Sequence, residues 1–565
     1  MNWSFKDLKY ERVEINPIPQ EIVELAKKIK NPADAKELAA NYREFDKWMN
    51  HMETMAVLGD IRFTIDTGNE FYKAEREYYD MYLPSVSELA VSVGNSLLDS
   101  PYRSEVEELV GSVALRNMEL ERKSISPAII ADMQRENSLA SEYQTLTASA
   151  KISFDGKELT LPQLEPYKLS TDREVRRAAV EAEGKYFASI APQLDRVFDD
   201  LVKVRTGMAK KLGFETYTDM SYCMRKRNCF SKEDIAVFRD NVAKNVSPLV
   251  TKLLCRQYER TGIDDPKVWD RPLVFTDGNP KPHGTPEEIF ANGKKMYHEL
   301  SKETGEFMDF MLEHDLFDVL SKPGKANGGY CTGLADFKAP FVFANFNGTQ
   351  GDIEVLTHEC GHAFEGYTGA RLYDIGAKRE YTSEIAEIHS MGMEFFTYPW
   401  MKLFFEEDTD KFYYSHMFGD LKFWPYGCMI DHFQHSVYDN PEWTPAERNE
   451  EWSRIEKLYR PDIDNADVPH YANGGMWQYK LHVYLYPFYY IDYCLAQFGA
   501  ASFWKLMRDD RELAWSKYYE LVKAGGTKDY VTLLTEAGFE SPFEADALKN
   551  IATAMYDYLC SLDVH

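Results

Sequence analysis

The pentapeptide His358-Glu359-Cys360-Gly361-His362 has residue types that could hold a metal ion and use it for hydrolysis. Residues four apart on an α-helix lie about 40° apart around its axis and about 6 Å apart along it, so two imidazoles can converge on one ion. Glu359 faces the same side and can reach a water molecule on the metal. Chance alone would produce such a pentapeptide about 0.05 times in this chain. The alternative, two histidines buried for packing, leaves their desolvation uncompensated.

A catalytic zinc ion needs a third protein ligand and an open fourth position. The metzincin pattern would place glycine at 365 and histidine at 368, but the chain has Glu365 and Thr368, which excludes that branch. Many peptidases with two histidines and one glutamate would have the glutamate where this chain has Tyr381. The acidic residues that remain are Glu380, Glu384, Glu387 and Glu394. Spacing alone does not choose among them.

Three elements must position these residues. A helix that begins near Asp352 would carry both histidines, and a second helix over 383–396 would carry acidic candidates. The alternating residues 341–346 predict a short strand before the first helix, closed by Asn347-Gly348. An exposed edge of this strand could bind an extended peptide through main-chain hydrogen bonds. The predicted substrate-binding residues are Phe343, Ala344, Asn345, Phe346 and Gly348.

The rest of the chain is predicted to be mostly α, with a few short strands. The first 150 residues read as consecutive helices, punctuated by Pro84, Pro101 and Pro127. Apolar residues that alternate on both sides of Asp155-Gly156 predict a β-hairpin over 152–161. Proline and glycine mark a long loop over 261–285.

The length of the chain, 565 residues, exceeds what one hydrophobic core usually holds, so we expect at least two packed lobes. We predict an N-terminal helical lobe over 1–190, which includes the hairpin, and a catalytic region over 191–565. The family resemblance described below implies that the core of this region lies at 330–500.

The charge and the cysteines limit the possible functions. The formal net charge is −27, with no basic run, so the chain is a poor partner for nucleic acid or for an anionic membrane surface. Eight cysteines without a CxxC pair suit a reducing compartment. No apolar N-terminal region and no membrane-length apolar stretch is visible. We expect a soluble, cytoplasmic protein.

The segment Glu387-Ile388-His389-Ser390-Met391-Gly392-Met393-Glu394-Phe395-Phe396, placed after the two histidines, resembles the oligoendopeptidase F branch of the thimet-oligopeptidase-like zinc metallopeptidases. In that family the third ligand begins a Glu-x-x-Ser-x-x-x-Glu run about 25 residues after the second histidine. The resemblance implies that Glu387 is the third zinc ligand and that Ser390 and Glu394 support the ligands. We expect Glu384 on a solvated helix face.

The resemblance extends to Tyr330-Cys331, to the segment 340–348, and to His482-Val483-Tyr484-Leu485-Tyr486-Pro487-Phe488-Tyr489-Tyr490-Ile491-Asp492-Tyr493. The family's tyrosines in this last segment have the spacing of Tyr486, Tyr490 and Tyr493. His482 stands one residue closer to the first tyrosine than in the thimet branch. A tyrosine with its pKa near 10 stays protonated at neutral pH and can donate to an oxyanion. The resemblance implies catalytic roles for His482 and the three tyrosines.

The resemblance also implies a zincin-type core in an elongated, two-lobed helical body, with a deep central channel that admits short peptides and excludes folded proteins. The sequence therefore predicts an endopeptidase with one Zn²⁺ per chain, which hydrolyses internal bonds of short unfolded oligopeptides. Its general base would be Glu359, which would then return the proton to the leaving amine.

Two other functions remain open. One is a carboxypeptidase of a related zincin family, which would need a cationic group to anchor the substrate terminus. The other is a non-catalytic, zinc-containing peptide-binding protein. Glu359 argues against the latter, because a structural zinc site has no use for a base.

Overall fold

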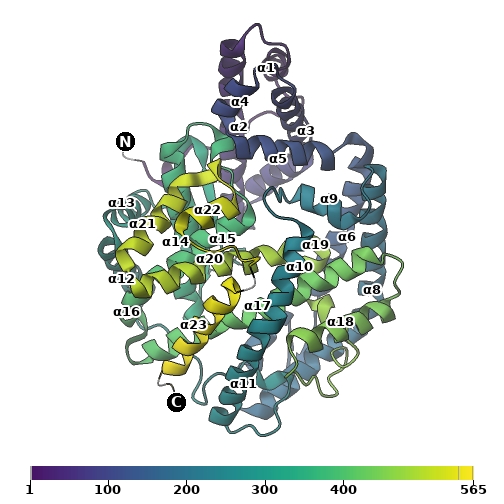
Figure 1. Ribbon diagram of the computed structural model, residues 1–565, viewed down its shortest axis with the longest axis vertical. Coiled ribbons are helices and arrows are strands. Elements are labelled where there is room, and N and C mark those ends of the chain that lie inside the picture. Colours follow the sequence, from purple (N-terminus) through teal and green to yellow (C-terminus); the bar gives the residue numbers. More distant parts are fainter. Residues whose placement is uncertain (1–2, 323, 327, 545, 563, 565) are drawn as a thin grey trace. The chain divides into compact units, whose positions relative to one another are not determined.

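The computed structural model describes residues 3–562 and 564, apart from 323, 327 and 545. Helices make up most of these residues, and the described strands are short and form two small sheets (Figure 1). This confirms the predicted fold class, mostly α with a few short strands. The chain divides into two compact units, each built from three segments. The first unit comprises Met1–Arg122, Lys281–Thr409 and Gly499–Phe539, and the second comprises Lys123–Pro280, Asp410–Phe498 and Glu540–His565.

The helices and strands of the first unit include both helices predicted for the metal site. They are α1 (Gln20–Lys30), α2 (Ala35–Ile65), α3 (Glu70–Leu98), α4 (Arg103–Val110), α12 (Pro286–Leu300), α13 (Lys302–Glu313), β3 (Phe317–Leu320), β4 (Tyr330–Leu334), β5 (Ala339–Phe346), α14 (Gln350–Leu372), α15 (Ser383–Phe396), α16 (Lys402–Phe405), α21 (Arg511–Ala524) and α22 (Tyr530–Ala537).

The second unit contains the predicted hairpin and the segment around His482. Its elements are α6 (Ile130–Ala148), β1 (Ile152–Phe154), β2 (Lys157–Leu159), α7 (Leu161–Lys168), α8 (Arg173–Lys211), α9 (Tyr217–Met224), α10 (Lys232–Asn241), α11 (Ser247–Thr261), α18 (Pro445–Tyr459), α19 (Leu481–Leu485) and α23 (Ala547–Ser561). Residues of α5 (Ser112–Ser124), α17 (Thr409–Asp439) and α20 (Tyr490–Asp509) belong to both units. The division at residue 190 stays a prediction.

No described helix is both long enough and apolar enough to cross a membrane. No disulfide bond joins the cysteines that the structure describes.

The hairpin forms where the sequence predicts it. β1 and β2 pair in antiparallel fashion, with Ile152 opposite Leu159. Asp155 and Gly156 both have positive φ, 50° and 68°. Positive φ at both central residues is typical of a type I′ turn, whose twist matches that of the flanking strands.

Pro84 does not end a helix, contrary to the sequence-based expectation. It lies inside α3, which continues to Leu98. Residues on both sides of the proline, Tyr79 and Val86, are buried in one apolar cluster with Ile15 and Met52. This packing offsets the hydrogen bond that a proline removes from a helix.

The second sheet has the order β3-β5-β4, with β5 parallel to β3 and antiparallel to β4. Phe343 on β5 pairs with Asp318 on one side and with Tyr330 on the other. The strand predicted at 341–346 is therefore central and has no free edge along these pairs. The edge-binding argument is wrong for Phe343, because β3 and β4 occupy both edges of β5 there. Substrate binding by Ala344, Asn345, Phe346 and Gly348 stays a prediction.

The histidine-bearing helix α14 is tied to the sheet by a tight turn. Gly348, just after β5, has a φ of +78°, which favours glycine. The Asp352 carboxylate accepts hydrogen bonds from the backbone N–H groups of Asn347, at 2.9 Å, and Gly348, at 2.7 Å. A carboxylate in the first turn also complements the helix dipole. The turn and this cap together fix where α14 begins.

The second helix of the site, α15, has the predicted bounds, and it is held between two others. On one side Gly361 of α14 faces it so closely that a Cβ there would lie 2.5 Å from the backbone oxygen of His389 and 2.6 Å from the Cα of Ser390. On the other side a Cβ on Gly392 would lie 2.8 Å from the ring of Tyr518, on α21. The Tyr518 hydroxyl donates a hydrogen bond to the His389 carbonyl. Both glycines are needed for this close packing.

We expect Gly361→Ala to separate α14 and α15, because the added methyl group meets backbone atoms that cannot rotate away. Overpacking of this kind destabilises by about 1–3 kcal/mol, so the midpoint of thermal unfolding should fall, as measured by circular dichroism. Gly366→Ala, in the same helix, is the control, since a Cβ there meets nothing closer than 3.8 Å. Equal midpoints for the two variants would show that the helices do not pack this closely.

Candidate metal centre

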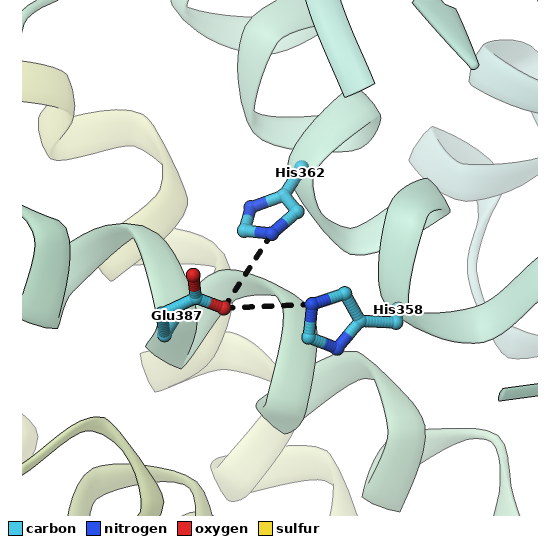
Figure 2. Close-up of side chains that lie close together, drawn as sticks. All are labelled: His358, His362 and Glu387. Carbon is cyan, nitrogen blue, oxygen red and sulfur yellow. Dashed lines mark ion pairs between the residues drawn. The ribbon is translucent and has the colours of Figure 1, made fainter. Parts of the chain in front are cut away.

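Three side chains of the first unit converge as a metal site requires. His358 and His362 project from α14 and Glu387 from α15, with their ligand atoms within 4.8 Å of one another. Figure 2 shows both imidazoles turned toward one Glu387 oxygen. This oxygen, Oε2, lies 3.4 Å from the Nε2 atom of His358 and 3.6 Å from that of His362.

These separations fit a shared zinc ion. Zinc binds histidine nitrogen and carboxylate oxygen at about 2.0–2.2 Å, so two ligands at tetrahedral angles lie about 3.3–3.5 Å apart. An ordinary N–H···O hydrogen bond is shorter, at about 2.7–3.2 Å. The three side chains are thus spaced as ligands around one ion would be, and the residues present fit the metal that the sequence predicts.

The neighbours of the three ligands fix their orientation. The Nδ1 atom of His358 lies 2.6 Å from Glu394 Oε1, which leaves its Nε2 atom to face Glu387. Ser390 donates a hydrogen bond to Glu387 Oε2 at 3.1 Å. Such partners hold a ligand in the tautomer and direction that a metal needs. The structure therefore places Ser390 and Glu394 beside the ligands, as the resemblance implied.

The ionisation of two of the three ligands suits a metal. The third, His358, must first lose a proton, because its contacts with Glu387 and Glu394 outweigh burial and raise its pKa well above the usual value. Burial, followed by the charge of His358, lowers the pKa of His362 to about 4, so its imidazole is neutral at neutral pH. Burial alone would raise the pKa of Glu387, but the neighbouring His358 and His362 and the Ser390 hydroxyl hold it below its usual value. A neutral imidazole and an ionised carboxylate are the forms that bind metal.

Glu359 lies on α14 between the two histidines and is partly exposed. Its pKa is raised, first by burial, against the charge of His358, and further by the charges of Glu387 and Glu394. A carboxylate with a raised pKa is a better proton acceptor than an ordinary one.

A buried polar group includes Glu365, which follows His362 by three residues on α14, and the sequence did not reveal this group. Burial raises the pKa of Glu365 to about 8, against the opposing effects of Tyr381 and Arg379. The Tyr381 ring stands edge-on to the fully buried His389, with centroids 5.0 Å apart. In the sequence, Glu365 and Tyr381 stand at positions that do not match other zinc-binding patterns. Nothing in their spacing predicts that their side chains contact each other.

Glu384 differs from expectation. Its side chain is 2% exposed rather than solvated, and it accepts a hydrogen bond from the Thr382 hydroxyl at 2.6 Å. Because Thr382 directly precedes α15, this hydrogen bond forms at the start of the helix. The expectation of a solvated face is therefore wrong for Glu384, whose buried carboxylate obtains a hydrogen bond from Thr382 in place of water.

The predicted catalytic histidine and tyrosines form one cluster in the second unit. The ring centroid of His482, on α19, lies 4.8 Å from that of Tyr490, 6.1 Å from that of Tyr486 and 6.5 Å from that of Tyr493. The ring of Tyr489 stacks on the imidazole at 6.0 Å. The structure thus brings all four predicted residues together.

Charge and burial set the protonation of this cluster. Burial, followed by the charges of Lys480 and Arg225, lowers the pKa of His482 to about 4, so the imidazole is neutral at neutral pH. Burial raises the pKa of Tyr490, which keeps its proton. Tyr486 is 52% exposed and open to a ligand. Each of these side chains can donate a hydrogen bond without first gaining a proton.

A pair of histidines one helical turn apart, with a glutamate between them and a carboxylate from a second helix, is the ligand set of a zinc hydrolase. Two family models match this chain: the Peptidase M3 N-terminal domain over residues 5–125, and Peptidase family M3 over residues 167–553. The chain belongs to peptidase family M3.

Solved structures resemble the chain over nearly its whole length. A PZ peptidase A with a bound inhibitor is 44% identical, with a TM-score of 0.92, over 99% of this chain and 100% of that one. An X-ray structure of a protein named as an oligoendopeptidase F is 43% identical, with a TM-score of 0.92, over 99% of both chains. Another so named, from Bacillus anthracis str. Ames, is 42% identical, with a TM-score of 0.87, over 99% of this chain and 98% of that one. No curated protein matches.

The family and these neighbours make the chain a metalloendopeptidase. The two family models match the chain before and after the hairpin. The second match includes the two histidines, Glu387 and the segment around His482. The resemblance stated from the motifs is thereby confirmed.

We expect Glu394→Gln to weaken zinc binding by about 10–100-fold, the usual effect of removing the carboxylate that orients a ligating histidine. Competition with a chromophoric zinc chelator measures this affinity directly. Glu313→Gln, an exposed glutamate of the same unit, is the control for loss of one negative charge. Equal zinc affinity in the wild type and Glu394→Gln would mean that Glu394 does not orient His358.

Proposed function

We propose that this metalloendopeptidase uses one zinc ion, held by His358, His362 and Glu387, to hydrolyse internal bonds of short unfolded oligopeptides. The observation that carries the proposal is the spacing of the three ligand atoms, with Glu387 Oε2 at 3.4 and 3.6 Å from the two imidazole nitrogens. The name oligoendopeptidase F, borne by neighbours at 42–43% identity, supports short peptides as the substrate class.

When bound, zinc supplies Lewis-acid chemistry, which polarises the scissile carbonyl and lowers the pKa of water. Glu359 accepts the proton of the attacking water and then delivers a proton to the leaving amine. Its raised pKa supports both steps, since a carboxylate of higher basicity takes up a proton more readily. Glu394 and Ser390 keep His358 and Glu387 in place during turnover.

We assign the stabilisation of the oxyanion to the cluster around His482. Tyr490 keeps its proton because burial raises its pKa, and it is therefore a hydrogen-bond donor at every physiological pH. His482, neutral at neutral pH, donates from a ring nitrogen. Tyr486, which is half exposed, and Tyr493 are further donors of the same segment.

Substrate recognition through main-chain hydrogen bonds requires a strand that is outermost in the sheet. β5 is central, so pairing with a peptide would fall to β4 or β3. We propose β4 for this role, because α14, which bears both histidines, packs against β4 and β5. Recognition of this kind reads peptide backbone and length more than side chains.

A peptide blocked at both ends tests the proposed function. We expect zinc-loaded wild type to cleave it at internal bonds, and Glu359→Gln to lower kcat by about 10²–10⁴-fold with an unchanged zinc content. Mass spectrometry of the products and elemental analysis of the protein provide the two measurements. Glu354→Gln, five residues earlier in α14, is the matched control.

Each other outcome has a distinct meaning. Cleavage of unblocked peptides alone would identify a carboxypeptidase. Zinc binding without any cleavage would identify a peptide-binding protein. A near-native kcat in Glu359→Gln would remove Glu359 from the role of base.

We expect Tyr490→Phe to lower kcat by about 10²-fold and to change KM much less, because an oxyanion donor acts mainly in the transition state. Steady-state kinetics on the blocked peptide separate the two constants. Tyr489→Phe is the control, since it keeps the ring that stacks on His482. A rise in KM at constant kcat would instead make Tyr490 a residue that binds the ground state.

A further inference from the structure

The second unit contains positively charged side chains that have few carboxylate partners. We call Lys422, Arg460 and Lys480 the basic cluster. All three are partly buried. The Lys480 Nζ atom lies 5.3 Å and the Arg460 Cζ atom 5.9 Å from the ring centroid of Tyr426, and Lys422 precedes Tyr426 by one turn on α17. In a chain with a net charge of −27, such a local excess of positive charge needs an explanation.

Among the residues that the structure describes, no carboxylate oxygen lies within 4.0 Å of the Lys480 ammonium nitrogen. Its Nζ atom instead lies 4.5 Å from the ring centroid of Tyr490. Burial lowers its pKa to about 8, so the ammonium group is still mostly charged at neutral pH. The faces of two tyrosines replace only part of the water that this charge has lost.

Lys422 is in the same situation. Within the described part of the chain it too lacks a carboxylate partner, and its Nζ atom lies 4.3 Å from the ring centroid of Phe418. Burial, followed by the charges of Arg271 and Arg460, lowers its pKa to about 8. Arg460 has one distant partner, Glu456, at 3.7 Å. These positive charges therefore repel one another, and few carboxylates nearby balance them.

The cluster borders the segment to which we assign the oxyanion donors. Tyr426 and Tyr490 meet edge to face, with ring centroids 5.9 Å apart. Phe423, next to Lys422 on α17, lies 5.3 Å from Tyr490. The charge of Lys480 also contributes to the lowered pKa of His482. An anion held by Lys480 would thus lie beside the ring of Tyr490.

We propose that the basic cluster binds a carboxylate of the peptide substrate, with Lys480 as the principal contact. A partly buried cation without a partner is costly, and an anionic ligand that arrives with each substrate removes that cost. Every short peptide has an α-carboxylate at its end, and some have acidic side chains as well. The proposal depends on the proposed function only in that Tyr490 acts on the same bound peptide.

If the bound carboxylate is the C-terminal one, the basic cluster limits how many residues can lie between the cleaved bond and the C-terminus of the peptide. The distance from Tyr490 to Lys480 is fixed by their packing, so the number of residues between the cleaved bond and the peptide's end would be limited. Bonds far from the C-terminus, which are the majority in a long chain, would lose this contact. A preference for bonds near the C-terminus would then arise from one ionic contact.

The test compares two peptides of one sequence, one with a free C-terminal acid and one with a C-terminal amide. We expect wild type to show a kcat/KM at least about tenfold higher for the acid, in line with a charge-assisted hydrogen bond. We expect Lys480→Gln to reduce this acid-to-amide ratio to nearly one. Because a ratio is measured, a general loss of activity in the variant does not mimic the effect.

Three further measurements complete the design. Lys480→Arg should keep most of the acid preference, since it restores the charge. Lys252→Gln, an exposed lysine of the same unit, should leave the ratio at the wild-type value. A pair of amidated peptides that differ by Glu or Gln near the C-terminus separates an acidic side chain from the terminal carboxylate as the source.

The outcomes separate this proposal from the proposed function. Equal hydrolysis of acid, amide, Glu and Gln peptides by wild type would overturn the carboxylate site while the endopeptidase assignment stands. A strong acid preference that Lys480→Gln leaves intact would overturn the assignment to Lys480. No hydrolysis of any peptide by the zinc-loaded enzyme would instead overturn the proposed function, and binding of acid and amide peptides to Glu359→Gln, measured by fluorescence anisotropy, would still test the carboxylate site.

Discussion

The absence of a side chain at Gly361 is the constraint on which the metal site depends. It allows α15 to approach α14 to within backbone contact, and this approach brings Glu387 to the two imidazoles. A helix pair spaced by ordinary side chains lies 8–10 Å apart, axis to axis. The third ligand would then need a longer reach, and its carboxylate would be less firmly fixed. The glycine within the histidine motif therefore has a structural reason of its own, separate from the chemistry of its neighbours.

Features that depend on local sequence were predictable. The hairpin follows from Asp155-Gly156, whose positive φ angles few other residues adopt. The bounds of α15 follow from its apolar periodicity, and the ligand pair follows from the spacing of a helical turn. The third ligand did not follow from the residues alone, since four glutamates had comparable positions. The family resemblance singled out Glu387, and the structure places that residue, with its supporting Ser390 and Glu394, at the histidines.

Features that depend on contacts between distant segments were not predictable. Residues 341–346 have the same alternation whether or not two other strands flank them, and only the pairing with Asp318 and Tyr330 makes the strand central. Pro84 lies within a helix because Ile15 and Met52, which are distant from it in the sequence, pack against the residues around it. The basic cluster gathers residues from α17, the end of α18 and the segment before α19, and none of these is unusual in its own surroundings.

The support of α15 by Tyr518 has a consequence for how the protein is made. The two helices that bear the ligands leave the ribosome together, but 129 residues separate His389 from the tyrosine that holds its carbonyl. Synthesis proceeds at about 5–20 residues per second. For some seconds, therefore, the nascent chain contains α15 without its partner α21, and the buried aromatic residues Phe395 and Phe396 have no completed surface to cover them. Chaperones that recognise exposed apolar segments would meet the enzyme at this stage of translation.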